Sequence, residues 1–402
     1  MSILNSILGI IFIFAVAFLL SNNKKMIKWR TIIIGFIIQF TFALAVLKWS
    51  VGRKVLSKIA LGVQAAIDYA GEGISFVFGG LANDPSIFVV NVLSVIIFIS
   101  AIVSILYYLG IMQFVIRVIG GALSKLLGTS KLETISATAN IFLGQTEAPL
   151  LIKPYVAKLT ESELFAVMVG GLASVSGSIL VGYSMLGIPI EYLISAAFMA
   201  APAGLIIAKI LCPETEFEKV QNEVKMVKDD SVNVVDAASK GALDGLQLVL
   251  NITAIILAFV AVIALFNGLL GWVGNLFGIS GLSLQSILGY LFAPIAAIIG
   301  VPWSEAVTAG SLIGQKLVLN EFVAFTSMAP LLGTLSAKTE AIITFALCGF
   351  ANISSIAILI GGIGGMAPER KSDIARLGWK AVLGGTLANL LSATIAGMLL
   401  TL

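Results

Sequence analysis

The chain has 402 residues, of which 59% are hydrophobic and only 11% are charged, and its formal net charge is +3. A typical soluble domain has about 25% charged residues, so this composition excludes an ordinary soluble protein and predicts an all-α polytopic membrane protein. The small net charge gives no reason to expect a nucleic-acid partner. The absence of histidine, with Cys212 and Cys348 as the two thiols, disfavours a transition-metal site.

Stretches of low charge mark about eight membrane spans, because a bilayer core of about 30 Å needs about 20 apolar residues in a helix. Two further segments, 52–82 and 111–130, mix basic and apolar residues and predict amphipathic helices at the membrane interface. The expected spans are 1–23, 31–47, part of 85–116, 164–190, 192–208, the start of 245–304, 341–366 and 381–402.

Basic residues set the expected orientation. Clusters at 24–30 and 370–380 indicate cytoplasmic loops, so the N-terminus is expected outside. The charged segment 212–240 is expected to be a cytoplasmic linker. The basic residues of 52–82 then lie outside, against the positive-inside rule, and this tension stays open.

A polar segment interrupts the apolar sequence at 140–150. Gln145, Thr146 and Glu147 stand in consecutive positions, with Gly144 before them and Pro149 after them. A carboxylate at membrane depth is costly, and broken backbone is tolerated there only where protein or a water-filled cavity satisfies it. We therefore expect the tip of a re-entrant helical hairpin that presents polar groups to a ligand. A second re-entrant hairpin is expected within 271–340, which is too polar for a lipid-facing span and makes no net crossing.

The two hairpin regions are related by a short internal repeat. Gly144-Gln145 is echoed by Gly314-Gln315, and the segment 171–176 is echoed by 349–354. Three expected spans separate the two copies, and because this number is odd the second copy would be inverted. Inverted repeats with interrupted helices are typical of secondary transporters, whose binding site lies near the middle of the bilayer.

The polar residues of the two repeats suit a neutral ligand rich in hydroxyl or amide groups, because their donors and acceptors would replace its lost hydration. Phe350 is placed to stack on a flat ring. The alternative is a structural role, in which serines in the spans only pack helices together. The candidate binding residues are Gln145, Thr146, Glu147, Asn320, Glu321, Asn352, Ser354 and Ser355.

A coupling cation has two candidate locations. The oxygens of Asn140 and Ser174, with carbonyls of a broken helix, suit Na⁺. Glu147 or Glu321 would instead serve a proton. The residues alone do not decide between the Na⁺ site and the proton site. A channel or a membrane-embedded enzyme is the alternative of another class, although no nucleophile–base pair or metal ligand set is visible.

Three motifs carry a resemblance to a known family: Gly144–Leu150, Asn320–Ala324, and Cys348–Asn352 with the following Ser354-Ser355. On these motifs the chain resembles the concentrative nucleoside transporters over nearly its whole length. The resemblance implies a homotrimer with eight spans, two re-entrant hairpins and interfacial helices per subunit. It also implies a transport domain that moves like an elevator against a trimeric scaffold.

The resemblance further implies a role for individual residues. The nucleobase would be contacted by Gln145, Thr146 and Glu147, with Ile179 packed against it. The ribose would be held by Glu321, Asn352 and Ser355, with Phe350 nearby. A Na⁺ ion would be bound by the side chains of Asn140 and Ser174 and by the backbone carbonyls of Leu143 and Val175.

The sequence is similar to the sodium-coupled branch of that family. Proton-coupled bacterial members tend to carry Gly-Gln-Ser-Glu followed by a non-proline apolar residue, whereas this chain has Thr146 and Pro149 and retains Asn140 and Ser174. We expect a Na⁺-coupled importer of a uridine-like or purine nucleoside in a bacterial plasma membrane, with H⁺ as the alternative ion. The expected division is 1–110 mainly scaffold, 111–211 first transport repeat, 212–240 linker, 241–290 scaffold span and 291–402 second transport repeat.

Overall fold

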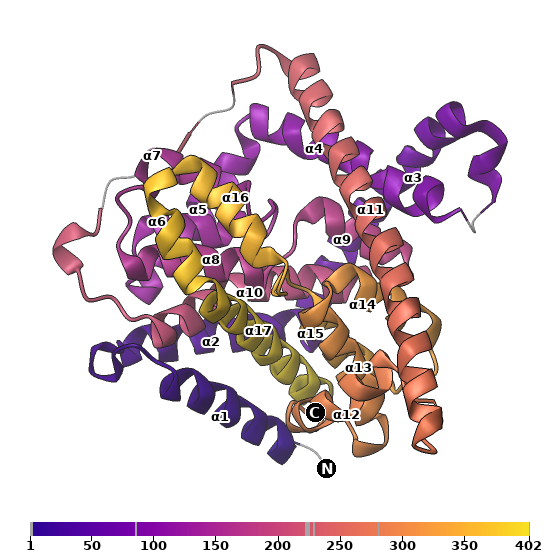
Figure 1. The fold of residues 1–402 in the computed structure, drawn as a ribbon. Coiled ribbons are helices and arrows are strands. Elements are labelled where there is room, and N and C mark those ends of the chain that lie inside the picture. The colour runs from indigo at the N-terminus through magenta and orange to yellow at the C-terminus, as the bar shows by residue number, and fades with distance from the viewer. Residues whose placement is uncertain (1–2, 85–86, 222–225, 228–229, 280, 402) are drawn as a thin grey trace.

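The computed structural model describes residues 3–84, 87–221, 226–227, 230–279 and 281–401 (Figure 1). This part of the chain is helical and contains no strand, which confirms the expected all-α class. Its α-helices are α1 Ile3–Leu19, α2 Trp29–Leu47, α3 Ser50–Phe78, α4 Ser94–Tyr108, α5 Ile111–Leu127, α6 Lys131–Ala139, α7 Lys153–Val156, α8 Glu161–Ala173, α9 Gly177–Met185, α10 Ile190–Leu211, α11 Val234–Leu276, α12 Leu284–Ile298, α13 Trp303–Val318, α14 Glu321–Met328, α15 Ala337–Leu347, α16 Ser355–Met366 and α17 Lys371–Thr401.

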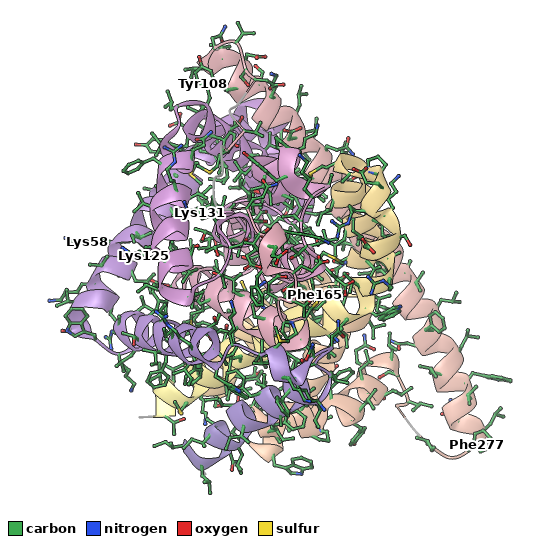
Figure 2. The ribbon with its side chains drawn as sticks, turned by 90° about the vertical axis from the view of Figure 1, so that its left-hand side faces the viewer. Lys58, Tyr108, Lys125, Lys131, Phe165 and Phe277 are labelled. Carbon is green, nitrogen blue, oxygen red and sulfur yellow. The ribbon has the colours of Figure 1, made fainter. Side chains whose placement is uncertain are left out.

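The centre of the molecule is built from α8, α10 and α17, which contact one another. In each of these spans 89% of the apolar window is buried inside the protein. α17 runs diagonally through the middle of Figure 1, and Phe165 of α8 lies in the interior of Figure 2. A Cβ added at Gly385 of α17 would lie 2.8 Å from Cβ of Leu172, so a small residue is needed for this close approach of the backbones.

The periphery is formed by helices that leave their apolar side chains uncovered. α11 has 43 residues, but only 17% of its apolar window is buried, and it packs mainly against α4. Phe277, directly after α11, lies at the margin in Figure 2. Because α11 already begins at Val234, the end of the segment expected as the linker 212–240 is helical. Such an uncovered apolar helix suits a hydrocarbon surrounding.

Several of the expected spans are interrupted in the structure. In the described residues six helices are long and apolar enough to cross a bilayer, or seven if the bent pair α12–α13 is one span. α1 has 17 residues and falls short of that length. The span expected at 341–366 is divided into α15 and α16 by residues 348–354, and the fourth span is divided into α8 and α9 by residues 174–176.

The two regions expected as hairpins differ in build. In the first, α6 is followed by a turn at 140–147 and by the 3₁₀ helix η4, Ala148–Ile152. The second contains an additional helix, because α12 and α13 are bent by 116° at residues 299–302. Gly300 allows that bend, since its φ of +108° disfavours a side chain. The polar tip of the second region therefore lies between α13 and α14, at residues 319–320.

Candidate functional site

The breaks of the two divided spans and the two polar tips meet at one place. The backbone N–H of Gly177 donates to the carbonyl of Phe142 at 3.0 Å, which joins the first tip to the break between α8 and α9. Phe350 N–H donates to Ser174 O at 3.2 Å, which joins the two breaks. Ile353 N–H donates to Leu317 O at 3.1 Å, which joins the second break to α13. Residues from both repeats thus form one polar region inside an apolar core.

The first tip carries buried side-chain oxygens that accept no hydrogen bond from the described residues. Asn140 follows the last turn of α6 and is 1% exposed, and its Nδ2 donates to Ser136 O at 2.9 Å. Asn140 Oδ1 has no hydrogen-bond partner among the described residues. Ser174 Oγ donates to Asn140 O at 2.7 Å and to Val175 O at 3.4 Å. A buried amide oxygen without a donor is costly, which is a reason to expect a cationic or hydrogen-bonding ligand there.

Gln145, Thr146 and Glu147 sit on three different neighbours. Gln145 is buried, its Oε1 has no partner within the described structure, and its Cβ lies against Gly171, where an added Cβ would be 2.9 Å away. Thr146 lies against Gly362 of α16. Glu147 is exposed, and its Oε2 accepts a 3.1 Å hydrogen bond from the N–H of Gly144. The three consecutive side chains therefore lie against α8, against α16 and against the backbone of the tip, respectively.

The second tip begins at the N-terminus of α14. Asn320 caps this helix, with Oδ1 accepting from Val323 N–H at 2.8 Å. Glu321 is 6% exposed, and its two oxygens have different donors. Oε1 accepts from the hydroxyl of Tyr183 on α9 at 3.1 Å, and Oε2 accepts from Nδ2 of Asn352 at 3.3 Å.

Asn352 extends this network along the second break. Its Oδ1 accepts from the Oγ of Ser354 at 2.7 Å and from the N–H of Ser355 at 2.9 Å. Ser355 Oγ also donates to Phe350 O at 2.6 Å. The structure therefore brings the candidate residues Glu321, Asn352 and Ser355 into one hydrogen-bonded chain, with the buried Phe350 at its end. Ile179, on α9, is likewise buried.

Sequence reasoning missed Tyr183 and Asn389. Tyr183 is wholly buried and contacts Phe325 of α14, with ring centroids 4.3 Å apart. A lone tyrosine in an apolar span is a weak signal for a hydroxyl that holds a carboxylate. Asn389 lies in α17, far in sequence from every motif, although an asparagine inside a buried span is itself a signal of an interhelical hydrogen bond.

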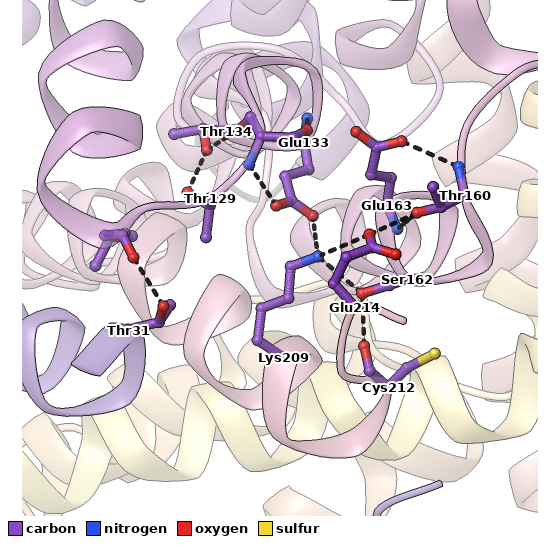
Figure 3. A network of polar contacts seen from close by, with 12 residues as sticks. Thr31, Thr129, Glu133, Thr134, Thr160, Ser162, Glu163, Lys209, Cys212 and Glu214 are labelled. Carbon is purple, nitrogen blue, oxygen red and sulfur yellow. Dashed lines mark hydrogen bonds and ion pairs between the residues drawn. The ribbon is translucent and has the colours of Figure 1, made fainter. Parts of the chain in front are cut away.

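A second polar cluster lies at the opposite end of α6 (Figure 3). Lys209 of α10 has its Nζ 2.5 Å from Oε2 of Glu133, and it donates to Ser162 Oγ at 2.8 Å. Thr160 Oγ1 donates to Oε2 of Glu214 at 2.7 Å. A cavity of about 200 Å³ opens beside Glu133, Lys209 and Glu214. This cluster ties the start of α6 to α8 and α10, and none of the candidate site residues belongs to it.

Comparison with known protein families shows the class to which the protein belongs. Three family models match consecutive parts of the chain: Na⁺ dependent nucleoside transporter N-terminus at 8–81, Nucleoside recognition at 89–189, and Na⁺ dependent nucleoside transporter C-terminus at 192–397. The chain belongs to the concentrative nucleoside transporter family. Members of this family are transporters, so the protein is a multi-pass membrane transporter and not an enzyme.

Individual relatives are similar over the full length of the chain. The nucleoside permease NupC of Helicobacter pylori is 49% identical over 100% of this chain and 99% of its own, and the uncharacterized transporter YutK of Bacillus subtilis is 59% identical over 99% and 100%. The solved structure of CNTnw in an inward-facing substrate-bound state is 51% identical, with a TM-score of 0.96 over 99% of this chain and 98% of that chain. Variants of CNTnw in outward-facing and intermediate states match with TM-scores of 0.96 and 0.97.

Proposed function

We propose that the protein imports nucleosides across a bacterial plasma membrane by symport with Na⁺. Membership of a nucleoside transporter family supports the substrate class. The observation that supports the ion assignment is Asn140 Oδ1, a buried amide oxygen that has no donor in the described part of the chain and lies beside Ser174. In this proposal Na⁺ is held by the side chains of Asn140 and Ser174 and by the carbonyls of Leu143 and Val175.

The nucleoside is assigned to the two tips together. The first tip, with Gln145, Thr146 and Glu147, offers an amide, a hydroxyl and a carboxylate to the edge of a nucleobase. The base packs on Ile179. On the second side, Glu321, Asn352 and Ser355 hold the ribose hydroxyls, and Phe350 stands beside them. A site built from such donors and acceptors discriminates strongly against ligands that lack the matching groups, because its buried polar atoms would then stay unpaired.

Coupling follows from the adjacency of the two sites. Na⁺ at Asn140 would favour one backbone conformation of the turn 140–147, which is the same turn that aims Gln145 and Glu147. Because binding free energies are reciprocal, an ion that strengthens nucleoside binding is itself bound more tightly when nucleoside is present. That mutual preference allows a Na⁺ gradient to drive accumulation.

We further assign the family's architecture to this chain. The tips are re-entrant, three copies assemble through their scaffolds, the N-terminus lies outside, and the core moves like an elevator. The contrast between the buried α8, α10 and α17 and the uncovered α11 supports a compact moving core beside a lipid- or partner-facing helix. CNTnw variants in outward-facing and intermediate states support the motion. The domain division given above remains a prediction.

The test is uptake of labelled uridine and adenosine into proteoliposomes with an imposed Na⁺ gradient or an imposed proton gradient. We expect accumulation above equilibrium with Na⁺ alone. Accumulation with protons alone would keep the nucleoside and move coupling to a carboxylate such as Glu147 or Glu321. Uptake that never exceeds equilibrium under either gradient would contradict active transport and indicate a channel.

A further inference from the structure

We propose that Lys316 and Asn389 form a pair of positioning residues that fixes the place where the two broken spans cross, and thereby sets the affinity for Na⁺. This inference rests on the proposed Na⁺ coupling. It concerns two residues whose described hydrogen bonds go to Ala173, Ala346 and Cys348 and to each other, and not to the residues assigned to the ion or the nucleoside.

Asn389 binds the end of each broken span. It lies on α17 and is 2% exposed. Its Nδ2 donates to the carbonyl of Ala173, the last residue of α8, at 2.6 Å and to the carbonyl of Cys348, which directly follows α15, at 3.1 Å. The last carbonyls of a helix have no intrahelical donor. One amide therefore supplies a donor to both helix ends at the same time.

Lys316 fixes the orientation of that amide. It lies on α13, is 2% exposed, and its Nζ donates to Asn389 Oδ1 at 2.6 Å and to the carbonyl of Ala346 on α15 at 2.8 Å. Because Oδ1 of Asn389 is occupied by the lysine donor, the NH₂ group must face the two carbonyls. A basic group at a helix C-terminus is also favourable to the helix dipole.

The packing around this pair leaves little room for adjustment. A Cβ added at Gly349 would lie 2.3 Å from Asn389 Oδ1, so the backbone of the second break approaches the amide as closely as a glycine permits. The next residue, Phe350, donates its N–H to Ser174 O. Asn389 therefore bonds to Ala173, which directly precedes Ser174 in the chain. It also lies against Gly349, which directly precedes Phe350.

This placement predicts which property changes when the pair is removed. The carbonyls of Ala173 and Cys348 would lose their donors and turn toward other partners, which would displace Ser174 and Val175. The Na⁺ affinity should then fall more than the nucleoside affinity measured at saturating Na⁺. A purely structural pair would lower stability and leave the Na⁺ dependence unchanged.

The experiment compares Asn389→Ala and Lys316→Met with the wild-type protein in two assays. The first is the rise in melting temperature of the purified protein on adding Na⁺ in place of choline, without nucleoside, which reports Na⁺ binding through linkage. The second is the Na⁺ concentration that gives half-maximal uridine uptake. We expect this concentration to rise at least about tenfold in both variants, within the usual range of coupling between sites, and the Na⁺-induced shift in melting temperature to shrink.

The matched control is Gln39→Met. Gln39 Nε2 donates to Ser392 Oγ at 3.0 Å, so this variant also removes a buried hydrogen bond to α17, about one turn from Asn389. It should destabilise the protein and keep the wild-type Na⁺ response. If Asn389→Ala does not fold, Asn389→Asp, which keeps the acceptor for Lys316 and removes the donors, takes its place with the same expected result.

Each outcome separates this inference from the proposed function. A wild-type Na⁺ response that persists in the folded variants overturns this inference alone. A wild-type protein without any Na⁺ response overturns the Na⁺ assignment and this inference together. Failure of both Asn389 variants to fold, with a normal Na⁺ curve in Lys316→Met, would make the pair structural and would overturn the positioning role.

Discussion

The two polar tips, which sit at corresponding places in the two repeats, satisfy their polar atoms in opposite ways. Around the first tip four buried side-chain oxygens have no partner among the described residues: Ser136 Oγ, Thr138 Oγ1, Asn140 Oδ1 and Gln145 Oε1. Around the second tip a continuous chain of hydrogen bonds links Tyr183 to Glu321, Asn352 and Ser355. The first tip is therefore arranged to gain contacts from a ligand, and the second is arranged to offer a ligand a rigid, preformed surface.

This difference has an energetic meaning. A buried oxygen without a donor costs about 1–3 kcal/mol, which a ligand that satisfies it returns as binding free energy. A preorganised network loses little conformational entropy on binding, so it favours specificity. The contrast predicts that changes at the second tip disrupt the empty protein and the complex alike, whereas changes at the first tip act mainly on the liganded protein.

The largest effect is expected for Glu321→Gln, because the new amide NH₂ would face the donors of Tyr183 or Asn352. Uridine uptake into proteoliposomes should fall at least about 100-fold, the equivalent of about 3 kcal/mol. Uptake of free uracil should not appear in its place. Glu72→Gln on the exposed face of α3 is the control and should keep wild-type uptake. Wild-type uptake by Glu321→Gln would remove Glu321 from the ribose site.

Asn140→Ala is expected to have the next largest effect, and to act first on Na⁺ binding. It removes Oδ1, which has no partner among the described residues, together with the Nδ2 hydrogen bond to Ser136 O, and it leaves the bonded network of the second tip intact. The Na⁺ concentration for half-maximal uptake should rise about tenfold or more, since an ion ligand is lost. Stimulation by Na⁺ equal to that of the wild type would place the ion elsewhere.

Tyr183→Phe tests whether the second tip depends on its hydrogen bonds. The phenylalanine keeps the ring that packs on Phe325 and removes only the donor to Glu321. A hydrogen bond to a charged group is worth about 1.5–3 kcal/mol, so kcat/KM for uridine should fall about tenfold, and the Na⁺ curve should not move. An unchanged kcat/KM would mean that Glu321 is held by Asn352 alone.

The smallest effects are expected for two serine variants, one at each tip. Their melting temperatures, measured by thermal unfolding without ligand, compare the two tips directly. Ser355→Ala deletes a hydroxyl that donates to Phe350 O and should lower stability by about 1 kcal/mol. Ser136→Ala deletes a buried hydroxyl without a partner in the described structure and should be neutral or slightly stabilising. The reverse order of melting temperatures would show that the unpaired atoms of the first tip are satisfied in solution.

The sequence predicted the candidate binding residues better than the residues that hold them in place. Glu321 and Asn352 were expected because a carboxylate and an amide at membrane depth are expensive and so stand out in an apolar chain. Tyr183 looked like any packing aromatic, since the hydroxyl that matters is directed by tertiary contacts. Asn389 is remote from every motif, and only the packing of both α8 and α15 against α17 brings their terminal carbonyls to it.

The fold was predictable where hydrophobicity alone decides and less so where backbone breaks decide. The apolar runs located α2, α4, α10 and α11. A break near Ser174 was expected in the fourth span, but a charge count does not give its bounds, residues 174–176. The bend between α12 and α13 had a readable signal in Gly300 and Pro302, which punctuate the run 245–304. Its direction follows from packing and could not be read from composition.

Both native thiols lie inside the fold, with Cys348 wholly buried and Cys212 only 4% exposed. Burial raises the pKa of the Cys212 thiol to about 11, and thiol-reactive labels attack the thiolate form. The natural chain is therefore a nearly unreactive background for site-directed labelling. A single cysteine in place of Leu150, which is 45% exposed next to the first tip, would give an optical or mass-tag readout of that surface without removal of either native cysteine.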